Sequence, residues 1–222
     1  MVEGFSSPRA WSFTLLGIHE YLRYYPSDPR INNMRKSLTE QLVRLWNTCA
    51  TEDWPWFEPV VTYDNACLCH TLILSGQWMP NAEALEIGLK SLRWLVSIQK
   101  TQAGYFRPIG SNGFYLRDGA RADYDQQPLE AQSMVSACHE AFRATQDSEW
   151  LNEAKRSFEW FLDRNDLNVP LYDFRTGGCS DGLHEDRVSD NQGAESTLAF
   201  HLSLAEMNFA EHLITPPPLP SP

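Results

Sequence analysis

The segment VVTYDNACLCHTLILS (residues 60–75) sets a polar tripeptide, Tyr63-Asp64-Asn65, directly before an apolar run that predicts a helix. A similar tripeptide, Tyr124-Asp125-Gln126, stands 61 positions later, and Asn191-Gln192 stands 66 positions beyond Asp125, each at a predicted helix start. This spacing indicates a repeat of helical hairpins, because stacked hairpins bury a face that one hairpin cannot bury alone. The sequence therefore predicts an all-α fold.

Seven helices are expected, with short connections inside each pair and long connections between pairs. In the first helix, Trp11, Leu15 and Ile18 recur at spacings of three and four, which is typical of one buried helix face. The predicted helices cover residues 8–24, 29–45, 63–75, 82–98, 127–144, 147–163 and 192–212. In the second long connection, the aromatic runs that flank residues 110–113 predict a short β-hairpin.

The long connections are the candidate functional region. Stacked hairpins place all of these links at one end of the array, together with the N-termini of the odd-numbered helices and their unpaired N–H groups. The links are rich in aromatic, carboxylate and amide side chains. Aromatic faces stack on sugar rings, and carboxylates and amides pair with hydroxyl groups, so the pattern favours a saccharide-binding surface.

Three carboxylates are candidates for acid–base chemistry on a glycosidic bond: Asp64 and Asp125, which are equivalent in adjacent repeats, and Glu195. An aspartate at a helix start can equally serve as a cap, and this second interpretation stays open. The candidate substrate-binding residues come from the same links and helix starts, namely Trp54, Trp56, Glu58, Tyr63, Asn65, Arg107, Tyr124, Gln126, Gln127, Glu130, Asp181, His184 and Gln192.

Composition excludes several classes of protein. There are 29 acidic and 18 basic residues, and the formal net charge of −11 opposes nucleic-acid binding, which needs clustered Lys and Arg. No apolar run of about 18 residues occurs, so no membrane span is expected. The first residues lack the order of a signal peptide, and five cysteines without a framework spacing favour a reducing cytoplasm.

No cofactor or metal ion is predicted. Phosphate-binding and dinucleotide-binding glycine motifs do not occur in the sequence. The group Cys67, Cys69 and His70 and the loop around Cys179 and His184 contain ligand types, but neither has a recognised zinc spacing.

Five motifs resemble one known group of domains. They are WPWFEPVVTYDNA (54–66), FRPIGSNGFY (106–115), DQQPLEAQSMV (125–135), LYDFRTGGCSDGLH (171–184) and NQGAESTLAF (191–200). Together they are similar to the α/α toroids of the six-hairpin-glycosidase-like group, which occur beside or fused to bacterial and archaeal GT-B glycosyltransferases. The chain departs from that pattern at Cys67 and Cys69, where relatives carry a basic residue and a proline.

The resemblance implies a partial α/α toroid in residues 1–212, and the proline content of residues 213–222 predicts a disordered tail after it. A complete toroid has about twelve helices, so seven correspond to its C-terminal portion. We expect that either a further N-terminal stretch, a second copy or a partner such as a glycosyltransferase completes the ring. The implied function is a glycosidase-like activity on a saccharide or glycoconjugate. The alternative is a non-catalytic module that binds glycans or scaffolds a glycosyltransferase.

Overall fold

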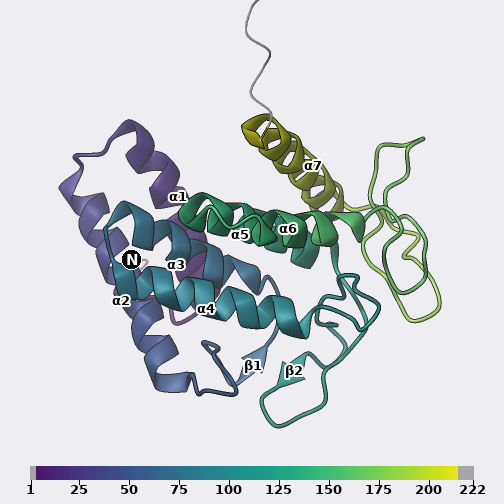
Figure 1. Ribbon diagram of the computed structural model, residues 1–222, viewed down its shortest axis with the longest axis horizontal. Coiled ribbons are helices and arrows are strands. Elements are labelled where there is room, and N and C mark those ends of the chain that lie inside the picture. Colours follow the sequence, from purple (N-terminus) through teal and green to yellow (C-terminus); the bar gives the residue numbers. More distant parts are fainter. Residues whose placement is uncertain (1–3, 215–222) are drawn as a thin grey trace, which may run out of the picture.

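The computed structural model describes residues 4–214, with side chains up to Phe209. Seven helices lie in these residues (Figure 1). They are α1 (Pro8–Tyr24), α2 (Pro29–Cys49), α3 (Ala66–Trp78), α4 (Ala82–Ile98), α5 (Pro128–Thr145), α6 (Glu149–Glu159) and α7 (Ala194–Ile214). No helix in the described part of the chain is long and apolar enough to cross a membrane.

Local sequence signals explain where several helices begin. The Ser7 side chain accepts a hydrogen bond from the Ala10 amide before α1, and Asp28 accepts from the amides of Arg30 and Ile31 before α2. Proline occupies the first turn of both helices, where its missing N–H would have no intrahelical partner. These helix starts agree with the sequence predictions.

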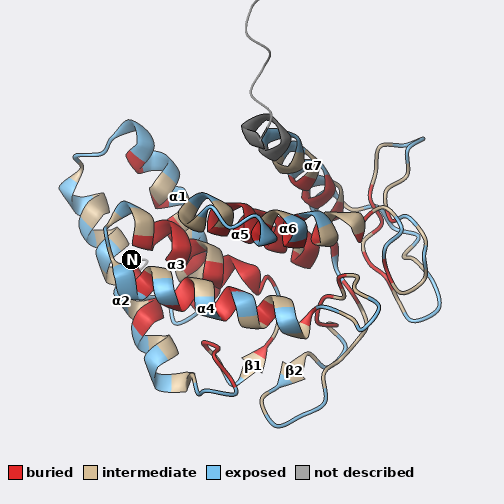
Figure 2. Ribbon diagram, viewed as in Figure 1, coloured by how far each residue is buried: buried red, intermediate tan, exposed pale blue. Residues whose placement is uncertain are grey.

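The helices form two layers. In the first layer α1, α3, α5 and α7 lie side by side in that order, and α2, α4 and α6 each pack against their hairpin partners to form the second layer. Buried residues concentrate on α3 and α5, which are central in the first layer (Figure 2). We call the side of the first layer that points away from α2, α4 and α6 the inner face.

Two glycines allow α3 and α4 to approach closely. A Cβ atom on Gly76 of α3 would lie 2.6 Å from the backbone nitrogen of Leu85, and one on Gly88 of α4 would lie 2.8 Å from Cγ1 of Ile73. Both distances are shorter than a carbon atom tolerates. The tightest hairpin of the fold therefore depends on the absence of side chains at these two positions.

The three long links are joined to one another at one end of the layers. Strand β1 (Val60–Val61) in the first link pairs antiparallel with β2 (Tyr115–Leu116) in the second. Gln126 and Leu183 exchange two backbone hydrogen bonds of 2.9 Å and so join the second link to the third. The predicted hairpin around residues 110–113 was wrong: in the described part of the chain, the two strands that pair come from different links.

Some boundaries differ from the predictions. Helix α3 begins at Ala66 rather than at residue 63, because Tyr63-Asp64-Asn65 forms the turn before it. Helix α6 is shorter than predicted and ends at Glu159. The predicted disordered tail began at residue 213, but residues 213 and 214 belong to α7, and residues 215–222 lie outside the described part of the chain.

Candidate functional site

Asp64 lies at the N-terminus of α3 in a turn held by the neighbouring helix. The φ angle of Asp64 is +45°, and only 3% of the residue's surface is exposed. The Glu130 carboxylate, in the first turn of α5, accepts hydrogen bonds from the Asp64 amide and, at 3.4 and 3.0 Å, from the amide and side-chain nitrogens of Asn65. Glu130 therefore satisfies N–H groups at the start of α3 that no residue of α3 can satisfy.

Arg9 connects helix α1 to the same turn. Its Nη1 lies 2.7 Å from Glu58 Oε2, its Nη2 donates to Asn65 Oδ1 at 3.2 Å, and its Nε donates to the Tyr63 carbonyl at 2.5 Å. The guanidinium also lies over the Tyr63 ring, 5.0 Å from its centroid. Because the guanidinium is planar and has several donors, one side chain fixes α1, the first link and the α3 turn together.

Burial changes the acidity of two carboxyl groups in this network. Burial raises the pKa of Asp64, opposed by hydrogen bonds from Ser133 and Cys67 and by the charge of Arg9, while the charge of Glu195 raises it further. Burial, together with the charge of Asp64, raises the pKa of Glu130 to about 7. The charges of Glu130 and of the exposed Glu195 are thus each coupled to Asp64, and burial favours the neutral form of Asp64 more than water does.

Asp125 lies at the same end but has a different partner. Its Oδ1 is 2.5 Å from Nδ1 of His184, and both side chains are partly exposed. The backbone on either side is fixed by the second link: Ser111 donates to the Asp125 carbonyl at 2.9 Å, and Asn112 donates to the Tyr124 carbonyl at 3.1 Å. This carboxylate can therefore reach a ligand from solvent, with an imidazole that orients it.

Two predicted binding residues of the second link hold the loops together. Gln126 is fully buried; its Oε1 accepts from the Trp160 indole at 2.8 Å, and its Nε2 donates to Asp166 Oδ2 at 2.5 Å. Arg107 Nε donates to both oxygens of Asp166 at 2.9 Å. The structure therefore places both side chains in a network that joins the second and third links.

Asp181 and Gln192 support the start of α7. Asp181 Oδ1 accepts from the Gly193 amide at 2.7 Å, and its other oxygen accepts from the Asn191 side chain. Gln192 Oε1 accepts from the Thr176 hydroxyl at 3.0 Å. Asp181 thus acts as a cap at the start of α7. Its hydrogen bonds fix the backbone at Gly193, two residues before Glu195.

The tryptophans occupy the core rather than a surface. Trp54 is 3% exposed and Trp56 is fully buried. Trp54 contacts Trp94 and Tyr115 edge-on at centroid distances of 4.9 and 5.0 Å, and its indole donates to the Glu58 carbonyl at 2.8 Å. Neither ring presents a face to a ligand, which corrects that expectation for these two residues. The exposed residues of the predicted binding set are Tyr63, at 46% exposure, Gln127 and Gln192, while Tyr124 is half-buried.

Sequence reasoning did not identify Arg9 or Ser133 as parts of this region, and it placed Asp166 in the third link without making it a candidate site residue. Arg9 and Ser133 lie within helices, where a polar residue on a turn is ordinary, and only their burial distinguishes them. Asp166 is surrounded by Tyr105, Arg107 and Gln126, which are distant in sequence. No group of three or more His, Cys, Asp or Glu side chains among residues 4–209 is arranged to hold a metal ion.

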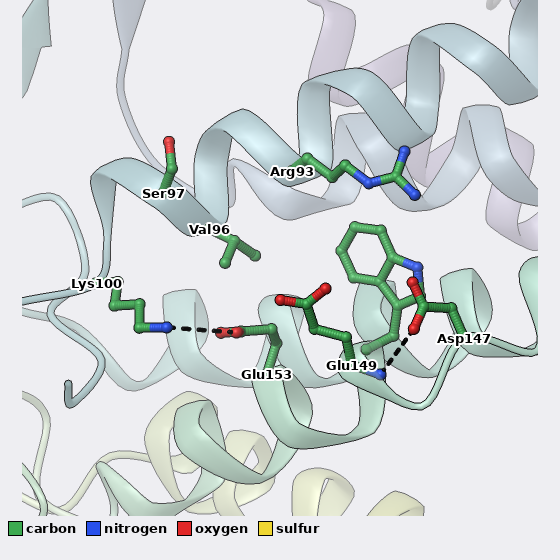
Figure 3. Close-up of a pocket in the computed structure, with 8 residues that line it drawn as sticks. Arg93, Val96, Ser97, Lys100, Asp147, Glu149 and Glu153 are labelled. Atoms are coloured by element: carbon green, nitrogen blue, oxygen red, sulfur yellow. Dashed lines mark hydrogen bonds and ion pairs between the residues drawn. The ribbon is translucent and has the colours of Figure 1, made fainter.

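A separate cavity of about 290 Å³ lies between α4 and the start of α6 (Figure 3). Lys100 and Glu153 face each other across it at 4.0 Å, and Arg93 lies over the ring of Trp150. None of the candidate catalytic residues lines this cavity, so it is distinct from the site at the helix N-termini.

No protein-family model matches this chain, and no curated protein matches it in sequence. Among solved structures, it is similar to the GH76A α-1,6-mannanase from Salegentibacter sp. HEL1_6, with a TM-score of 0.63 and 15% sequence identity. The match covers 95% of this chain but 62% of the mannanase chain, so this chain spans less than two thirds of that protein's length. The similarity shows the fold: this chain has the helical-hairpin architecture of an α/α-toroid glycosidase.

Proposed function

We propose that this chain is a carbohydrate-active, glycosidase-like domain that acts on a saccharide at the N-terminal ends of α3, α5 and α7. The observation that carries the proposal is the buried Asp64, whose pKa is raised by burial and, to a smaller extent, by the charge of Glu195, on a fold similar to that of an α-1,6-mannanase. A carboxyl group that retains its proton, next to carboxylates in more polar surroundings, is the arrangement that glycoside hydrolysis requires.

In the proposed mechanism, Asp64 donates its proton to the glycosidic oxygen as the C–O bond to the anomeric carbon breaks. The Asp125 carboxylate, oriented by His184, removes a proton from a water molecule that attacks the same carbon. Glu195 stabilises the positive charge that develops on the sugar ring, and Tyr63 and Tyr124 contact its face. A carboxyl separation of roughly 6.5–9.5 Å would give inversion, and one of about 5 Å would make Asp125 a nucleophile.

The test is hydrolysis of α-1,6-linked mannan and a panel of other oligosaccharides, followed by reducing-sugar release. Asp64→Asn and Asp125→Asn should each reduce turnover by at least about 100-fold, which is the contribution of one acid or base. Asp118→Asn is the matched control, because Asp118 is an exposed aspartate in the second link, which also contains Asp125. Unchanged activity in both site variants would exclude the mechanism.

A non-catalytic role is the second candidate. Asp64 is almost inaccessible and hydrogen-bonded within the protein, which favours a glycan-binding or glycosyltransferase-scaffolding module in which the carboxylates only support the helix starts. In that case a titration would show saccharide binding without any release of reducing sugar.

We also infer that a partner extends the helical layer beyond α7. Leu198, Leu202 and Phe209 of α7 are more than half exposed and recur at spacings of four and seven, so they form one apolar stripe. A second copy of the chain or a glycosyltransferase in a reducing, cytoplasmic compartment would cover it. Size-exclusion chromatography with light scattering checks the first possibility.

A further inference from the structure

A second cavity lies between α1, α3 and α5, and none of Asp64, Asp125 and Glu195 lines it. It has a volume of about 520 Å³, within the range of roughly 300–1,000 Å³ that ligand pockets occupy. Its lining residues come from α1, α3 and α5, and on α1 and α5 they lie in the C-terminal half of the helix. It is lined by Leu16, His19, Glu20, Arg23, His70, Leu74, Gln77, Trp78, Glu140 and Arg143.

The charged groups of this cavity neutralise one another. Glu20 pairs with Arg23 at 3.0 Å, and the buried Glu140 pairs with Arg143 at 3.0 Å. Gln77 Nε2 donates to the second oxygen of Glu140 at 2.6 Å, so that carboxylate is held from two sides. With two acids matched to two guanidinium groups, the cavity favours an uncharged, polar ligand over an ion.

Two imidazoles are available to such a ligand. His19 and His70 make no hydrogen bond to another described residue, and burial lowers the pKa of both, so both rings are uncharged at neutral pH. A neutral imidazole offers one donor and one acceptor, as a sugar hydroxyl does. Their nitrogens can therefore pair with hydroxyl groups in either direction.

Trp78 supplies an aromatic surface. It is 44% exposed, and His19 contacts its ring edge-on at a centroid distance of 4.3 Å, which fixes the indole. From these contacts we infer that the cavity binds one neutral sugar unit, with its ring against Trp78 and its hydroxyls on His19 and His70. Because α3 rises 1.5 Å per residue, Trp78 lies about 18 Å and His70 about 6 Å along the helix from Ala66. None of Asp64, Asp125 and Glu195 lines the cavity, so it is a second glycan contact, and it extends the carbohydrate function proposed above.

The experiment is an isothermal titration calorimetry measurement of α-1,6-mannobiose binding. It compares the Asp64→Asn protein, in which the substitution prevents turnover, with the same protein carrying Trp78→Ala in addition. The Trp78→Ala change should weaken binding at least tenfold, His70→Ala should also weaken it, and Trp78→Phe should restore part of the affinity. Tyr24→Ala is the matched control, because Tyr24 is a highly exposed aromatic at the same end of α1 that does not line the cavity.

The outcomes separate this inference from the proposed catalysis. Binding that depends on Trp78, together with a wild-type protein that releases no reducing sugar, would uphold the cavity and contradict the glycosidase proposal. An absence of binding, or equal affinity in the Trp78→Ala and Tyr24→Ala proteins, would overturn the inference even if the wild-type protein hydrolyses mannan.

Discussion

The carboxylate of Glu130 accepts hydrogen bonds from both the backbone and the side-chain nitrogen of Asn65, at 3.4 and 3.0 Å, across 65 positions of sequence. The first turn of α5 thus holds the turn that begins α3. Asp64, directly before Asn65, owes its position to this contact.

Glu130 should make stability depend on pH. The native carboxyl has a pKa of about 7, whereas an unfolded glutamate titrates near 4.5, so between these values the native state binds more protons. Stability should therefore be greatest below pH 4.5, as far as this group is concerned, and fall by on the order of 3 kcal/mol as pH rises through 7. Glu130→Gln should remove that dependence. Urea unfolding of both proteins at pH 5 and pH 8 measures how much the free energy of unfolding changes between these pH values. An equal change in the wild-type and Glu130→Gln proteins would contradict the assignment.

Removing Arg9 should destabilise the protein strongly. The Arg9–Glu58 pair is largely buried, and Arg9→Ala leaves the carboxylate without its partner, at a cost of about 3–5 kcal/mol. Arg23→Ala breaks an exposed pair with Glu20 on the same helix and should cost less than about 1 kcal/mol. Denaturant midpoints of the two variants compare the effects; similar losses would show that the Arg9 network is not structural.

Two glycine substitutions should act in opposite directions. A Cβ atom on Gly110 would lie 2.0 Å from the Tyr124 carbonyl oxygen, so Gly110→Ala should displace the backbone before Asp125 and cost at least about 1–3 kcal/mol. Gly17 lies in α1 with open space around it, and Gly17→Ala should stabilise the helix by up to about 1 kcal/mol. Thermal unfolding of both variants checks the signs, and a stable Gly110→Ala protein would refute the close contact.

Activity should decline on the alkaline side of its pH profile. If Asp64 is the general acid, its raised pKa keeps it protonated at mildly acidic pH, and turnover falls as pH rises through that pKa. Weakening the charge of the neighbouring carboxylate with Glu195→Gln should shift this alkaline limb to lower pH, since the charge of Glu195 raises the pKa of Asp64. If the alkaline limb lies at the same pH in the wild-type and Glu195→Gln proteins, the charge of Glu195 does not influence the ionisation of the general acid, and the prediction is wrong.

The helices could be predicted because their signals are local. Apolar periodicity, Pro8 with the Ser7 cap before it, and Pro29 after Asp28 predicted where α1 and α2 begin. The strand pair was harder to predict. Val60–Val61 finds its partner in the next link, and a local turn motif gives no information about a segment more than 50 residues away.

The site could be predicted in part. Residues that precede helices, such as Asp64 and Asp125, were identified from the repeat, and the structure places both at the same end of the layers. Their contacts with Glu130 and His184 join residues 66 and 59 positions apart, which a single sequence does not specify. The sequence did not predict the burial of Trp54 and Trp56, because loops have no periodicity that distinguishes buried from exposed positions.

The pairing of β1 with β2, and of Gln126 with Leu183, has a consequence for access. Loops that act as lids move one at a time, each on its own hinges. Here a displacement of any one link would break the hydrogen bonds that attach it to the next. A ligand that binds at this end of the protein would contact a preorganised surface, so its affinity would not be reduced by the entropy cost of ordering mobile loops.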